Sequence, residues 1–348
     1  MNKRNRDRLR YLGARATMRL PDRLKLWLSG RPAVIIDGQQ LDAQVQLLGS
    51  VRRRAGGTYG LIEPTIEAGR ARLRRETSHF RGPITRVGNV RDFTIPGPGG
   101  DLRVRHYAPV SAAMAPLTVY LHGGGFVIGD LDTHDEPCRI LCRFGHTHVL
   151  SVDYRCAPEN PFPAAVEDAA AAFAWARANA ASLGADPQRV AIGGDSAGGN
   201  LSAVVAHTTR GTSAPKAQLL IYPPTDHKRR RSHELFGEGF FLTNRDREAF
   251  GKAYAAPRSE EPNPLVSPLH FSDFSGLPPA LVVIAGFDIL RDEGEEYAAK
   301  LAAAGTPTRV QRYVSLGHGF IHLTGICTTA RRAMIAIAEE WRRLVRDG

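Results

Sequence analysis

The chain has 348 residues, of which 43% are hydrophobic and 23% are charged, as in ordinary soluble globular proteins. No apolar run approaches the roughly 20 residues that a membrane-spanning helix needs, and the stretch Leu24–Leu28 is too short for a signal-peptide core. We therefore expect a cytoplasmic protein. Its length suits one large core with an added cap, or two domains. The four cysteines form no Cys-x-x-Cys pair, which favours buried structural thiols over a zinc site.

Positive charge is concentrated near the N-terminus. Residues 1–90 contain 19 Lys and Arg against 7 Asp and Glu, a net +12, whereas the remaining residues carry a net −1. A solvated, Arg-rich helix face is the simpler interpretation. The alternative is peripheral contact with an anionic membrane. No aromatic interleaving or nucleic-acid motif favours nucleic acid as a partner.

Residues 1–83 predict helices, and we expect them to form an Arg-rich N-terminal cap segment. Apolar residues recur there at spacings of three and four in four separate stripes. Asp42 is expected to cap the third helix, and Pro64 to occupy the first position of the fourth. The four stripes run over residues 9–20, 24–28, 41–51 and 66–80.

From residue 84 the pattern changes to alternating strands and helices, which predicts an α/β catalytic domain over residues 84–348. We expect an eight-stranded, mostly parallel sheet with helices on both faces, its first two strands joined by a hairpin at Pro96–Gly100. Residues 224–275 interrupt the alternation and are expected to pack with the N-terminal helices as a helical cap. The predicted strands are 85–95, 101–107, 117–121, 148–153, 189–193, 217–222, 280–285 and 308–314, and the predicted helices include 164–181, 197–209, 290–304 and 328–345.

The sequence Gly194–Gly198, with Ser196 at its centre, lies between a short apolar run and a helical stretch. Glycines at such a place let a strand turn sharply into a helix and expose the serine hydroxyl at the edge of a sheet. A neighbouring base could then deprotonate that hydroxyl for attack on a carbonyl carbon. The strand at 117–121 leads into His122–Gly125, whose three glycines let backbone N–H groups approach a substrate oxygen. A flexible turn is the alternative, and no phosphate-binding pattern follows.

Asp288 and His318 each lie just past the end of a predicted strand. An open parallel sheet places its ligand crevice at the carboxyl ends of its strands. The order Ser196, Asp288, His318 is that of an α/β-hydrolase triad, in which histidine is the base and the acid orients it. Asp292, Glu293 and His322 compete for these roles. Asp292 and Glu293 should lie in the next helix, and His322 lacks flanking glycines.

These motifs resemble the hormone-sensitive lipase-like group of bacterial carboxylesterases and acetyl esterases, over about residues 80–345. The resemblance implies hydrolysis of small-molecule esters with short to medium acyl chains through an acyl-enzyme, without cofactor or metal. One departure is Ile289, where the family usually has proline. The matching stretches are His122–Phe126, Leu131–His134, Asp153–Arg155, Ala157–Glu159, Phe162–Ala165, Gly194–Asn200, Asp288, Asp292–Gly294 and Gly317–Phe320.

The resemblance also implies an oxyanion hole. Its donors would be the backbone amides of Gly124, Gly125 and Ala197, which would hold the negative charge that develops on the carbonyl oxygen. His122 and Gly123 would shape the glycine loop rather than exchange protons.

The sequence leaves other functions open. An amidase or deacetylase could use the same triad, since no residue distinguishes an ester from an amide. A non-catalytic small-molecule-binding protein is a further alternative, although such proteins usually lose a triad member. Phe240, Phe241 and Leu242 could line an acyl pocket or simply pack within the cap. The physiological substrate and the oligomeric state are not specified.

Overall fold

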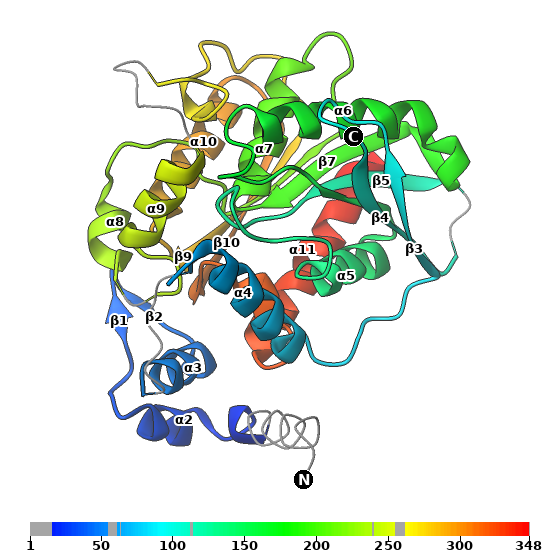
Figure 1. Ribbon diagram of the computed structural model, residues 1–348. Helices are drawn as coiled ribbons and strands as arrows, with labels where there is room; N and C mark the ends of the chain where they lie inside the picture. Colours follow the sequence, from blue (N-terminus) through cyan, green and yellow to red (C-terminus); the bar gives the residue numbers. More distant parts are fainter. Residues whose placement is uncertain are drawn as a thin grey trace.

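The computed structural model describes residues 16–54, 61–62, 64–111, 114–238, 240–254 and 262–347. An eight-stranded sheet forms its centre, in the order β10-β9-β8-β7-β5-β6-β4-β3 (Figure 1). The six strands from β10 to β6 in this order are parallel to one another, whereas β4 is antiparallel to both β6 and β3. The predicted sheet is thereby confirmed. The strands are β3 (Asn89–Ile95), β4 (Leu102–Ala108), β5 (Ala115–Leu121), β6 (His148–Asp153), β7 (Ala185–Asp195), β8 (Gln218–Ile221), β9 (Ala280–Phe287) and β10 (Thr308–Gly317).

Helices cover both faces of the sheet, with α5 and α11 on one face and α6, α7 and α10 on the other (Figure 1). Strands β5 and β9 are therefore buried along their whole length, which explains their predominantly apolar sequences. The helices are α2 (Asp22–Ser29), α3 (Ala43–Arg54), α4 (Ile66–Phe80), α5 (Asp135–Gly145), α6 (Ala164–Asn179), α7 (Ala197–Thr208), α8 (Arg231–Phe236), α9 (Asn244–Tyr254), α10 (Arg291–Ala303) and α11 (Thr328–Asp347). Short elements are β1 (Ile35–Ile36), β2 (Gln39–Gln40), η1 (Ala181–Leu183), η2 (Pro268–His270) and η3 (Phe320–Leu323).

Two of the N-terminal helices, α3 and α4, are capped at their start by a residue with an oxygen-bearing side chain. Asp42 caps α3 as predicted, since its Oδ1 accepts a hydrogen bond from the Gln44 amide at 2.8 Å. The prediction for Pro64 is wrong, because α4 begins at Ile66 and Thr65 is its N-cap residue. The Thr65 hydroxyl accepts the Ala68 amide hydrogen, which a proline ring cannot do. The helix predicted over residues 9–20 lies mainly outside the described residues.

Polar contacts tie these helices to the sheet domain. Arg70 of α4 forms a bidentate ion pair with Glu159, with both N–O distances at 2.8 Å, and also donates to the Val127 carbonyl. Gln44 of α3 accepts the Thr328 amide at the start of α11 at 2.8 Å. The N-terminal helices are thus docked on the α/β domain. The division of the chain at residue 83 stays a prediction.

One buried hydrogen bond links α11 to the sheet. Trp341 is fully buried, and its Nε1 donates to Thr118 Oγ1 of β5 at 2.9 Å. Thr118→Val keeps the shape but leaves the indole N–H without an acceptor, and an unpaired buried donor costs about 1–3 kcal/mol. We expect a loss of that size in the free energy of unfolding measured by urea titration.

The matched control is the same substitution in a Trp341→Phe background. Phenylalanine has no N–H, so the cost of Thr118→Val should shrink there. An equal cost in both backgrounds would show that the hydrogen bond contributes nothing.

Candidate active site

Ser196 occupies a tight turn between a strand and a helix. β7 ends at Asp195 and α7 follows directly, so Ser196 adopts φ 50° and ψ −121°, a region that non-glycine residues seldom occupy. A Cβ atom at Gly198 would lie 1.8 Å from the Leu121 carbonyl oxygen, so only glycine lets this turn pack against the end of β5. The Ser196 amide also donates to the Ile221 carbonyl at 2.8 Å. These contacts fix the serine at the carboxyl edge of the sheet.

The structure brings Ser196, His318 and Asp288 together as the sequence predicts. His318 Nε2 lies 3.0 Å from Ser196 Oγ, and His318 Nδ1 lies 2.7 Å from Asp288 Oδ2. The turn after β9 forms without the usual proline, because Ile289 is buried and the Leu290 amide donates to Asp288 Oδ1 at 2.9 Å. A histidine held between a hydroxyl and a carboxylate can take the proton of that hydroxyl.

The loop after β5 places backbone amides beside the serine. Gly124 has φ 126°, and a Cβ atom there would lie 1.9 Å from the Ile128 carbonyl oxygen, so this position requires glycine. Within the described ranges, the amides of Gly124, Gly125 and Ala197 donate no hydrogen bond to another protein group. Both glycines line the same cavity as Ser196. Such amides are the donors that an oxyanion needs.

His122 is completely buried at the base of this loop. Its ring stacks on Tyr154 with the centroids 4.2 Å apart, and its Nδ1 lies 3.0 Å from the Gly123 carbonyl oxygen. Burial lowers the pKa of His122 to about 4, so the imidazole is neutral near pH 7. These contacts fit a residue that shapes the loop rather than one that transfers protons.

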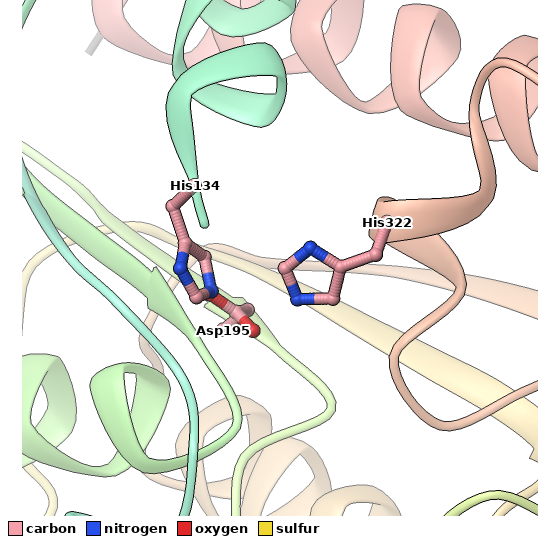
Figure 2. A group of neighbouring side chains, drawn as sticks. All are labelled: His134, Asp195 and His322. Atoms are coloured by element: carbon pink, nitrogen blue, oxygen red, sulfur yellow. The ribbon is translucent and has the colours of Figure 1, made fainter. Parts of the chain in front are cut away.

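Asp195, His134 and His322 form a polar cluster beside the glycine loop, which no pattern in the sequence predicts (Figure 2). His134 directly precedes α5, Asp195 ends β7, and His322 lies in η3. The Gly123 amide donates to Asp195 Oδ1 at 3.0 Å, and the Tyr120 hydroxyl donates to the same oxygen at 2.8 Å. The carboxylate therefore links the strand that carries the serine to the glycine loop.

Imidazole and carboxylate groups can bind transition metals, and the ligand atoms of this cluster lie within 4.8 Å of one another. However, Asp195 Oδ1 already accepts two hydrogen bonds and lies 3.2 Å from His134 Nε2. Burial opposes ionisation of Asp195, but contact with His134 and Tyr120 holds its pKa well below the usual range. Burial lowers the pKa of His322 to about 3. Asp195 Oδ1 is thus already used to hold the glycine loop.

A cavity of about 170 Å³ opens over Ser196 and His318. Its walls come from the sheet edge, from the N-terminal helices and from the 224–275 stretch, so both predicted cap segments border the serine. Phe240 is not among the lining residues, because its ring packs on Phe236 and Phe287 instead. Apolar lining residues include Leu61, Leu73, Phe80, Phe126, Phe241, Leu242, Phe250, Tyr254, Leu290 and Leu323.

Comparisons with known proteins agree with this geometry. A family model described as the alpha/beta hydrolase fold matches residues 118–322. The chain is 47% identical to carboxylic ester hydrolase LipN of Mycobacterium tuberculosis, over 90% of this chain and 85% of that protein. It is 40% identical to esterase LipI of the same organism, over 78% of this chain and 86% of that protein.

A solved structure is also similar. The ester-hydrolase EH1AB1, from the metagenome of Lake Arreo, superimposes with a TM-score of 0.83 at 39% identity, covering 87% of this chain and 98% of that one. The chain therefore belongs to the α/β-hydrolase-fold family, and within it to the hormone-sensitive lipase-like carboxylesterases that its motifs resemble.

Proposed function

We propose that the protein is a serine carboxylesterase that hydrolyses short- to medium-chain acyl esters through an acyl-enzyme on Ser196. Membership of its family makes it a carboxylic ester hydrolase. The observation that carries the finer proposal is the hydrogen-bonded line from Ser196 through His318 to Asp288, on the floor of an apolar cavity.

In the acylation step, Ser196 Oγ attacks the ester carbonyl carbon while His318 Nε2 takes the hydroxyl proton. Asp288 accepts the Nδ1 hydrogen of His318, which fixes the tautomer and stabilises the imidazolium. The amides of Gly124 and Gly125, with that of Ala197, hold the oxyanion of the tetrahedral intermediate. As the intermediate collapses, the imidazolium gives its proton to the departing alcohol.

Deacylation repeats the same proton transfers with water as the nucleophile. His318 takes a proton from water, the resulting hydroxide attacks the acyl carbon, and the tetrahedral intermediate forms again. Collapse of this intermediate breaks the bond to Ser196 Oγ, which recovers its proton from His318. The carboxylic acid product then leaves, and the hydrogen bonds of the free enzyme form again.

The size and walls of the cavity support a short acyl chain. Its volume of about 170 Å³ lies below the roughly 300–1,000 Å³ typical of pockets for drug-sized ligands. Phe241 forms part of its wall and also lines a second, neighbouring cavity. The Phe241 ring therefore stands between the two cavities and limits the depth of the first.

Replacing any one of the triad residues should nearly abolish ester hydrolysis. Ser196→Ala and His318→Ala remove the nucleophile or the base, and each should lower kcat for p-nitrophenyl butyrate by about 10⁴-fold or more. Asp288→Asn should cost about 10⁴-fold because the histidine loses its oriented tautomer. Steady-state kinetics on folded variants gives the comparison.

Asp292→Asn is the matched control, since the Asp292 carboxylate accepts the Ser232 amide rather than facing His318. Its kcat should stay within about tenfold of the wild type. A nearly normal Asp288→Asn enzyme together with an inactive Asp292→Asn enzyme would overturn the assignment of the acid.

Removing the Phe241 ring should join the two cavities and lengthen the preferred acyl chain. For Phe241→Ala, we expect the ratio of kcat/KM for octanoate to that for butyrate esters to rise by about tenfold or more, the scale set by extra methylenes in an apolar pocket. Phe271→Ala serves as a control, because Phe271 stacks on His207 and does not line the cavity. Identical chain-length profiles in both variants would remove Phe241 as a determinant.

A further inference from the structure

Helix α2 presents an apolar face to solvent. Trp27 is 76% exposed and Leu24 is 46% exposed, whereas large apolar side chains are normally buried. With 3.6 residues per turn, Arg23, Leu24 and Trp27 share one side of the helix, and Lys25 and Ser29, both buried, share the opposite side. The exposed side is therefore not the one by which α2 packs on the protein.

The opposite side of α2 is firmly attached to α3. Gln46 Nε2 donates to Ser29 Oγ at 3.0 Å. Arg54 donates to the carbonyls of Leu28 and Ser29 at 2.8 and 3.1 Å. The bonds from Arg54 supply donors for the last carbonyl groups of α2. Together the contacts with α3 leave the face with Trp27 directed away from the body of the protein.

The same region is strongly basic. Residues 16–54 contain seven Lys and Arg against three Asp, and residues 1–15 contain six Lys and Arg against one Asp. Arg19 and Arg31, which precede and follow α2, are exposed together with Arg23. Trp27 and Leu24 are therefore bordered by cationic side chains, the composition of helices that lie in a membrane interface.

The position of α2 in the fold leaves this face accessible. In Figure 1, α2 and α3 lie at one extremity of the molecule, away from the sheet. In the described part of the chain, no helix is long and apolar enough to cross a membrane. Helix α2 has 8 residues, too few to cross a membrane, so a contact made by α2 would be peripheral.

We propose that the α2 face, formed by Arg23, Leu24 and Trp27 with Arg19 and Arg31, binds the surface of an anionic phospholipid bilayer. The Trp27 ring and Leu24 enter the headgroup region, where tryptophan is favoured because it has an apolar body and a polar N–H. The arginines pair with lipid phosphates and anionic headgroups. Because each attraction is weak alone, binding depends on both the apolar and the cationic side chains.

Vesicle sedimentation of the full-length protein tests this proposal. Wild-type protein should pellet with phosphatidylcholine vesicles that contain one quarter phosphatidylglycerol, should pellet much less with pure phosphatidylcholine, and should be released by 0.5 M salt. The double variant Leu24→Ser/Trp27→Ser should lower the partition coefficient by about tenfold or more. Its hydrolysis of a soluble p-nitrophenyl ester should be unchanged, which verifies its fold.

Val310→Ser is the matched control, since Val310 is 51% exposed on β10, outside α2. It should bind vesicles like the wild type. Trp27 is the most exposed of the three tryptophans, so its fluorescence should shift to shorter wavelength with anionic vesicles, and Trp27→Phe should lose that shift.

Three results would overturn the proposal. The wild type could stay in the supernatant with anionic vesicles, or the double variant could pellet equally well. The third result is a wild-type dimer, seen by light scattering, that the double variant dissociates while vesicle binding is absent. That outcome would assign the α2 face to a second copy of the chain.

Discussion

The close contact between the turn that carries Ser196 and the end of β5 is the constraint on which the site depends. Cβ atoms at Gly194 and Gly198 would lie 2.2 and 1.8 Å from the same Leu121 carbonyl oxygen. Both glycines of the motif are therefore required by one backbone atom. Because β5 continues directly into the glycine loop, this contact fixes the nucleophile and the oxyanion donors relative to each other. Hydrogen-bond donors that are already in place before the reaction begins usually make the largest single contribution to catalysis.

Side-chain hydrogen bonds also hold the serine turn and the glycine loop in place. Asp195 accepts the Gly123 amide and so connects β7 to the glycine loop a second time. Asp288 follows β9, and His318 follows β10. Because these two strands are adjacent and parallel, the acid and the base lie side by side at one edge of the sheet. The order of strands in the sheet thus brings together residues that are far apart in the sequence.

The sequence was sufficient for those features that local patterns determine. Predominantly apolar strands, the capping Asp42 and a triad placed at strand ends all follow from spacing and residue type. The links between Asp195, His134 and His322 could not be predicted, because each comes from a different element and they meet only in the folded sheet. The roles of Phe240 and Phe241 could not be predicted either. Phe241 has φ 68°, a left-handed backbone conformation that no local pattern indicates, and it lines the cavity. Phe240 packs on Phe287 instead.

Covalent labelling of the resting enzyme tests the central claim most directly. A fluorophosphonate should add one phosphonyl group to the wild-type protein, and peptide mapping by mass spectrometry should locate it on Ser196. His318→Ala should slow labelling strongly, because the hydroxyl then lacks its base. Labelling of another residue, or equal labelling of wild type and Ser196→Ala, would contradict a nucleophilic Ser196.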